Sequence, residues 1–398
     1  MRYRSRLDLF TISALALFLI AGCSTVPPRN AAPDSVYAQV QIAGIPDARF
    51  WGDAAPPRAD QRILGQSRDE LRAMFPAMFA KPHNYLAISG GGQEGAFGAG
   101  LLVGWTEAGD RPEFQIVTGV STGALIAPFA FLGSSYDDKL KKVYTTISTT
   151  DILRKRWIGS ILFEGAAADS TPLLNLIQKY IDEAAIQAIA AEHKKGRRLF
   201  IGTTPIDEMR PLIWDIGAIA ASGRPEAMDL VHRVMLGSAS IPGAFPPVKI
   251  DVEANGITYD ELHVDGGTTN QVFIYPPALD WGEYLQKLEV TEKVNIYVIR
   301  NSSLERRRKV IEPSILPIAR QSISSLIRTQ GIGDLNLIYL QSQRDDANFR
   351  LALIPDDFEV VPKELFDNAY MNKLFDLGYE QAKAGYPWLD KPGAWVAD

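Results

Sequence analysis

Short apolar runs alternate with helical patterns along most of this 398-residue chain, and this alternation is the strongest constraint on its fold. Runs of strand length or slightly longer lie at residues 85–89, 114–120, 199–203, 212–220, 262–264 and 295–299. Helical patterns cover residues 95–108, 122–132 and 171–186, and the C-terminal third adds helices at 314–343 and 363–384 around a strand at 349–353. Strands that alternate with helices predict a largely parallel sheet with helices on both faces.

Composition removes several classes of protein. The formal net charge is −6, which argues against a general nucleic-acid binder, because such proteins carry a basic face. A single cysteine excludes an intramolecular disulfide framework and a cysteine-based zinc cluster. No composition bias indicates disorder or a fibrous protein. The oligomeric state is not indicated by any of these features.

The single cysteine, Cys23, follows a segment with the pattern of a secretory signal. Arg2, Arg4 and Arg6 precede an apolar run at residues 9–21. This run has 13 residues, whereas about 20 are needed to cross the hydrocarbon core of a bilayer. A basic start, a short apolar run and small residues at its end predict that residues 1–22 are a signal peptide.

The residues around Cys23 resemble a bacterial lipobox, Ile-Ala-Gly-Cys. The resemblance implies cleavage before Cys23 and acylation of this residue, which anchors the protein in a bacterial membrane. Ser24 in the next position favours, by analogy, the periplasmic side of the outer membrane. An ordinary signal peptide with an incidental cysteine is the alternative. Residues 23–60 are rich in proline and alanine and predict a tether, with one short strand at 36–42.

The residues Gly119-Val120-Ser121-Thr122-Gly123 match the pattern G-x-S-x-G. The match lies directly after an apolar strand and directly before an apolar helix, which is the context of a nucleophile elbow. Gly119 and Gly123 allow a tight turn that exposes the hydroxyl of Ser121 at the end of the strand. A glycine and serine turn with a purely structural role is the alternative.

A second glycine turn, Ser89-Gly90-Gly91-Gly92-Gln93-Glu94-Gly95, joins the first predicted strand to its helix. Gly90, Gly92 and Gly95 also fit a dinucleotide fingerprint, but the next strand lacks the acidic residue at its end that would bind a ribose. No Lys-Ser or Lys-Thr follows, so a P-loop is excluded. Backbone amides of such a turn bind anions, and an oxyanion hole with Gly91 and Gly92 as donors is the favoured interpretation over a structural role.

A nucleophilic serine needs a proton acceptor, and two candidates lie close together in the sequence. None of the four histidines lies beyond His263, which does not suit the Ser–Asp–His order of α/β-hydrolases. Asp265-Gly266-Gly267 follows a short apolar strand, and the glycines allow this carboxylate to turn into a crevice at the strand's end. His263 remains the rival base, since it lies on the same face of the strand.

These motifs in this order resemble the patatin-like phospholipases, and the stretch at residues 238–247 looks like the one before the aspartate motif in that family. The resemblance covers roughly residues 84–275 and implies a three-layer α/β/α sandwich with a mainly parallel sheet and a helical C-terminal extension. It implies lipid acyl ester hydrolysis without a metal or cofactor. Ser121 would be the nucleophile, Asp265 the base, and the amides around residues 90–92 the oxyanion hole. The remaining motif glycines are Gly95, Gly119, Gly123, Gly266 and Gly267.

Glu94 departs from the family pattern, which usually has arginine or lysine there. Because of this difference, two alternative functions stay open. The protein would bind lipid or a partner without turnover, or it would transfer the acyl group to an acceptor other than water. The basic run at residues 306–309 would contact anionic lipid headgroups or lie in a solvated loop.

We divide the chain into the signal (1–22), the acylated tether (23–60), the catalytic core (61–275) and the C-terminal part of the same domain (276–398).

Overall fold

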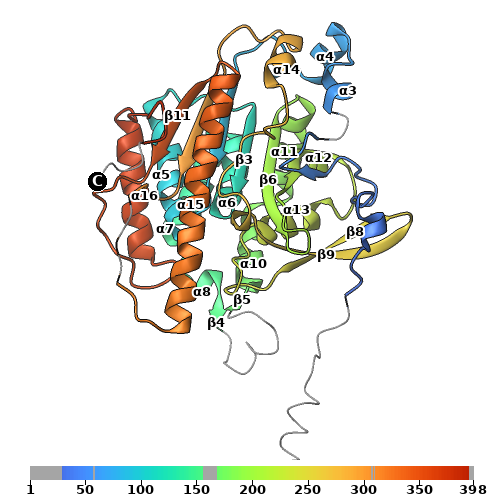
Figure 1. Ribbon diagram of the computed structural model, residues 1–398. Helices are drawn as coiled ribbons and strands as arrows, with labels where there is room; N and C mark the ends of the chain where they lie inside the picture. Colours follow the sequence, from blue (N-terminus) through green and yellow to red (C-terminus); the bar gives the residue numbers. More distant parts are fainter. Residues whose placement is uncertain (1–28, 57–58, 156–167, 306–307, 309, 394–398) are drawn as a thin grey trace, which may run out of the picture.

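The computed structural model describes residues 29–56, 59–155, 168–305, 308 and 310–393 (Figure 1). The predicted signal peptide and Cys23 therefore lie outside the described residues. A nine-stranded sheet forms the centre of the fold. Its main path runs in the order β1 (Arg49–Trp51), β7 (Leu212–Asp215), β6 (Arg198–Pro205), β3 (Ile116–Val120), β2 (Asn84–Ile88), β10 (Asn295–Arg300) and β11 (Asn348–Leu353). A hairpin of β8 (Val248–Ala254) and β9 (Ile257–Asp265) joins this path through β6.

The five neighbouring strands from β6 to β11 are parallel, and the strands beyond β6 are antiparallel. Because β2, β3 and β10 run the same way, their carboxyl ends meet at one edge of the sheet. In open α/β sheets this edge is where ligands bind. The arrangement confirms the mostly parallel sheet that the strand and helix alternation predicts.

Two hydrophobic cores lie on opposite faces of the sheet and define three layers. Leu86, Ile88 and Val117 belong to one core, whereas Tyr85 and Ala87 belong to the other, as the alternation of side chains along a strand requires. The first core packs against α5 (Gly95–Ala108), α6 (Thr122–Leu132), α7 (Asp137–Thr146) and α16 (Asn368–Lys383). The second packs against α14 (Trp281–Lys287) and the C-terminal half of α15 (Ile315–Arg344). The helical C-terminal part thus supplies one long helix to each face.

The remaining elements are short or lie at the ends of the sheet. They are α2 (Asp34–Tyr37), α3 (Ala59–Ile63), α4 (Arg68–Met74), η1 (Gly92–Glu94), η2 (Ser134–Tyr136), α8 (Thr149–Ile152), β4 (Arg154–Lys155), β5 (Ala168–Asp169), α10 (Thr171–Tyr180), α11 (Glu183–Lys194), α12 (Ile216–Ala221), α13 (Ala227–Ser238) and η3 (Gly266–Thr268).

Three predicted elements differ from the structure. The helix expected at 171–186 is two helices, because Asp182 adopts extended backbone angles and its side chain caps α11. The strand expected at 212–220 ends at Asp215, which caps α12 in the same way. The strand expected at 262–264 is the end of the longer β9, whose hairpin partner β8 the sequence analysis missed.

The N-terminal segment also differs from the prediction. Residues 36–42 do not form a strand, since α2 covers part of them and the strand of this region is β1. Where the sequence predicts a tether, the described residues 29–56 lie against the domain, as Figure 1 shows. Arg29 forms an ion pair with Asp260 of β9 at 2.9 Å, and the segment adds β1 to the edge of the sheet. Most of the predicted tether that is described is therefore part of the folded domain.

Candidate active site

Ser121 lies at the carboxyl edge of the sheet, between the end of β3 and the first residue of α6. Its backbone φ is +56°, a left-handed value that is strained for a residue with a side chain and is typical of functional turns. A side chain at Gly119 would overlap the carbonyl oxygen of Gly123, and one at Gly123 would overlap that of Ile88. The backbone N–H of Ser121 donates to the hydroxyl of Ser238 at 3.0 Å, which fixes the turn.

Asp265 is the last residue of β9, and the sheet brings it to the same edge. β9 pairs with β6, which pairs in turn with β3, so residues far apart in the sequence become neighbours. The Asp265 carboxylate accepts a hydrogen bond from the Gly267 N–H at 2.7 Å, and the hydroxyl of Ser121 lies near enough to influence its pKa. Burial raises the pKa of Asp265 from 3.8 to about 6, while the Ser121 hydroxyl and the Gly267 N–H oppose the rise. The structure thus brings together the two predicted catalytic residues.

The glycine loop after β2 forms the other side of the site. Gly90 lies so close to Ser121 that a Cβ atom at Gly90 would be 3.2 Å from the Ser121 Cβ. The Gly90 N–H donates to the Gln271 carbonyl at 3.0 Å and is therefore already occupied. In the part of the chain that the structure describes, no such bond is made by the N–H of Gly91 or Gly92. These two amides are the donors of the loop that a ligand can use.

Glu94 lies at the end of this loop and has two polar neighbours that the sequence does not indicate. The hydroxyl of Tyr370 donates to its carboxylate at 3.4 Å, and Arg300, at the end of β10, lies within electrostatic range. Burial, with a contribution from Arg328, lowers the pKa of Arg300 to about 10, while Asp334 and Glu94 oppose the change. No sequence signal marked Arg300, because an arginine at a strand end is usually solvated.

An apolar cavity with a volume of about 60 Å³ opens beside the nucleophile turn, lined by Gly92 and Thr122 together with side chains of several helices. Its apolar walls include Leu125, Phe129, Leu173, Ile177, Met235 and Phe366. The hydroxyl groups of Thr122 and Tyr144 are hydrogen-bonded to each other at 2.6 Å, so the lining presents little unpaired polarity. Such a pocket suits a hydrocarbon chain.

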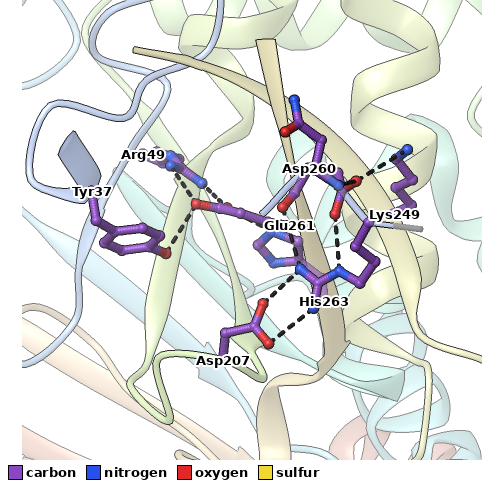
Figure 2. Close-up of polar contacts among 9 residues, drawn as sticks. Tyr37, Arg49, Asp207, Lys249, Asp260, Glu261 and His263 are labelled. Carbon is purple, nitrogen blue, oxygen red and sulfur yellow. Dashed lines mark hydrogen bonds and ion pairs between the residues drawn. The ribbon is translucent and has the colours of Figure 1, made fainter. Parts of the chain in front are cut away.

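His263, the rival base, has other partners (Figure 2). Its Nε2 contacts the carboxylate of Glu261 at 3.1 Å, and its Nδ1 contacts the hydroxyl of Thr203 at 3.1 Å. Glu261 in turn forms an ion pair with Arg49 from the N-terminal segment. Burial lowers the pKa of His263, although Glu261 opposes the change, so the ring is neutral at physiological pH. Both ring nitrogens are therefore engaged away from Ser121.

Ser121 lies at a strand–helix turn, near a buried carboxylate and beside an apolar pocket, an arrangement that resembles the nucleophile turn of α/β-hydrolases. A sequence model of the family described as patatin-like phospholipase matches residues 86–277, a span that includes both motif residues. The chain thus contains a patatin-like phospholipase domain. The match supports lipid acyl hydrolysis as its general activity.

The other comparisons add less. Among solved structures, the crystal structure of VipD from Legionella pneumophila is similar with 12% sequence identity and a TM-score of 0.35, over 78% of this chain and 69% of that chain. No curated protein sequence matches this chain. Within the described ranges, no helix is long and apolar enough to cross a membrane, and no cluster of three or more acidic, histidine or cysteine side chains has the arrangement of a metal site.

Proposed function

We propose that the protein hydrolyses acyl ester bonds of lipids with Ser121 as nucleophile and Asp265 as general base. The observation that carries this proposal is the proximity of the Ser121 hydroxyl to the buried Asp265 carboxylate at the carboxyl edge of the sheet. A carboxylate with an ordinary pKa is a poor base, but a pKa of about 6 brings Asp265 closer to the range in which a general base is efficient.

The reaction begins when Ser121 Oγ attacks the ester carbonyl carbon and its proton passes to Asp265. The tetrahedral intermediate then loses the alcohol, which takes the proton from Asp265 as the carbon–oxygen bond breaks. A water molecule attacks the acyl-enzyme and gives its proton to Asp265. Collapse of this second intermediate releases the fatty acid and returns the proton to Ser121, so no cofactor is needed.

The negative charge on the intermediate is stabilised by the N–H groups of Gly91 and Gly92. This assignment narrows the predicted oxyanion hole, because the Gly90 N–H is bonded to Gln271. Each preorganised donor of this kind is worth about 3–4 kcal/mol of transition-state stabilisation in comparable hydrolases. Since Gly92 also lines the apolar cavity, the acyl chain of the substrate would enter the pocket as its carbonyl oxygen meets the loop.

Covalent labelling tests the nucleophile directly. A fluorophosphonate probe is expected to label the wild type and a Ser324→Ala control, since Ser324 is exposed on α15, but not Ser121→Ala. Hydrolysis of a soluble short-chain ester is expected to fall at least about 10³-fold in Ser121→Ala and in Asp265→Asn. Labelling of folded Ser121→Ala at the wild-type rate would refute the assignment. Labelling of the wild type without ester turnover would instead support lipid binding or acyl transfer.

A matched pair of variants, His263→Asn and Asp265→Asn, tests whether His263 rather than Asp265 is the general base. His263→Asn removes the imidazole and leaves Asp265 in place, so the dyad predicts that the folded variant keeps its ester turnover, whereas Asp265→Asn loses it. If folded His263→Asn lost turnover while Asp265→Asn kept it, His263 rather than Asp265 would be the general base. Circular dichroism verifies folding, since His263 is fully buried.

We also propose that the mature protein is anchored through acylated Cys23 in the outer membrane. The lipobox resemblance and Ser24 support this proposal. Metabolic labelling with an alkyne fatty acid is expected to mark the wild type and not Cys23→Ala. Equal labelling of the two proteins would exclude the anchor.

A further inference from the structure

The two halves of helix α15 differ sharply in their environment. Its C-terminal half packs on the sheet through residues such as Leu335 and Ile338, which are buried. Its N-terminal half exposes five large aliphatic side chains. These are Ile315 (89% exposed), Ile318 (47%), Ile323 (55%), Leu326 (69%) and Ile327 (44%). At helical spacing they fall within about half of the circumference, which gives the helix an apolar face without a partner in the described protein. We call these five residues the α15 face.

The α15 face extends past the edge of the sheet that carries the candidate active site. Gly331 on α15 lies against the guanidinium of Arg300, the last residue of β10, and so marks the level of the carboxyl edge. The helix begins at Ile315, which places about 16 residues, or roughly 24 Å, beyond this point. Figure 1 shows α15 as the long orange helix that runs down to the level of α8 and β4. Ser121 and Asp265 lie at the same edge.

The chain around the α15 face carries positive charge in an otherwise acidic protein. Residues 304–330 contain six basic and two acidic residues, whereas the whole chain has a formal charge of −6. Arg308 is exposed just before the helix, and Arg328 lies at its middle, half buried. A helix with exposed aliphatic residues and basic neighbours is typical of segments that lie in the interface of an anionic membrane.

We propose that the α15 face docks the protein on the surface of an anionic lipid bilayer. This inference rests on the proposed lipid hydrolase function, since docking would bring the pocket entrance to its substrate. An isologous contact with a second copy would place these basic segments against each other, whereas an anionic bilayer carries the opposite charge, so we commit to the bilayer. Apolar side chains that are exposed in water gain free energy when they enter the region between headgroups and acyl chains.

The same helix is connected to the site by two successive hydrogen bonds. The Asp334 carboxylate accepts from the Gln271 N–H at 2.6 Å, and the Gln271 carbonyl accepts from the Gly90 N–H at 3.0 Å. Docking through the N-terminal half of α15 therefore places the glycine loop at a defined position relative to the membrane surface.

A fluorescent probe at one position tests the docking without interference from the N-terminus. Because Cys23 is the only cysteine, a Cys23→Ser background allows a single environment-sensitive label at Leu326→Cys or at Leu340→Cys. Leu340 is a matched control on the same helix, 63% exposed, in the half that packs on the sheet. A Ser121→Ala change prevents turnover of the vesicles. We expect phosphatidylglycerol vesicles to shift the emission of the label at 326 to the blue and to leave the label at 340 unchanged.

Equal responses at the two positions, or none at 326, would overturn the proposal. Phosphatidylcholine vesicles are expected to bind about tenfold more weakly, because the basic residues lose their attraction. Ile323→Gln together with Leu326→Gln is expected to lower vesicle affinity by about tenfold or more, whereas Leu340→Gln leaves it unchanged. A loss of self-association in the double variant, with no vesicle response of the label, would assign the α15 face to a second copy.

The docking proposal and the proposed hydrolase function can be tested separately. If the double variant keeps the hydrolysis of a soluble short-chain ester but loses that of phosphatidylglycerol vesicles, both proposals stand. Vesicle binding by wild type that never hydrolyses either substrate would reject the proposed function and retain the docking. Unchanged vesicle hydrolysis in the double variant would reject the docking alone.

Discussion

Asp265→Asn is expected to abolish catalysis and at the same time to stabilise the protein at neutral pH. The Asp265 carboxylate is buried, and burial raises its pKa from 3.8 to about 6. The folded state therefore holds a proton that the unfolded chain has released between these two pH values. Stability falls as pH rises wherever the folded state binds more protons, so Asp265 weakens the protein progressively from about pH 4 to pH 6.

The size of this effect on the free energy of unfolding follows from the shift in the pKa of Asp265. A difference of about 2 pKa units corresponds to about 3 kcal/mol, present in full above pH 6 and absent below pH 4. Asparagine has nearly the same shape, and its carbonyl oxygen still accepts from the Gly267 N–H, which donates to Asp265 at 2.7 Å. The variant thus removes the charge and retains the local geometry.

Urea unfolding of wild type and Asp265→Asn at pH 4, 5, 6 and 7 measures the effect. We expect the difference in unfolding free energy to move in favour of the variant by about 3 kcal/mol between pH 4 and pH 7. All other titrating groups are common to both proteins and cancel in this difference. If the unfolding free energies of the two proteins changed with pH in parallel over the whole range, Asp265 would not have a pKa raised by burial.

Three further outcomes follow from the same structure. Because the base must be deprotonated, kcat/KM for a soluble ester is expected to rise with pH and level off above about pH 6; a flat profile from pH 4 to 8 would contradict Asp265 as the base. Leu125→Trp narrows the apolar cavity, so turnover of long acyl chains is expected to fall relative to butyryl esters, as a chain-length series would measure; an unchanged preference would exclude this cavity as the acyl site. Arg49→Met leaves the buried Glu261 without its arginine partner and is expected to cost about 3–5 kcal/mol in urea unfolding, and Arg49→Met with Glu261→Leu is expected to cost less; equal losses would show that the ion pair is not the cause.

The core of the fold was predictable because its signals are local. Helices α5 and α6 begin and end where the sequence indicates, since each follows a glycine or serine turn after an apolar strand. The parallel direction of β2 and β3 follows from helix α5 between them. The proximity of Ser121 and Asp265 was implied by the resemblance of the motifs to the patatin-like phospholipases. Their catalytic roles remain predictions.

The failures have a common physical cause, which is that long-range pairing decided the structure. The short strand predicted at 262–264, which has only two apolar residues, gave no indication of the nine-residue strand β9, which exists because β8 pairs along most of its length. The N-terminal segment has the composition of a tether, yet Arg49 contributes a buried ion pair to Glu261. No local pattern indicates that partner, which lies more than two hundred positions away in the chain.

The position of Glu261 gives the N-terminal segment a structural role near the site. Glu261 and Asp265 are on one strand, four residues apart and on the same face, and His263 lies between them. Burial disfavours the charge of Glu261, but Arg49 and His263 outweigh this and hold the pKa of Glu261 well below its usual range. The resulting cluster, shown in Figure 2, links the strand that ends in Asp265 to the edge strand β1 of the same sheet. His263, which the sequence offers as a rival base, is therefore better explained as a neutral member of this cluster.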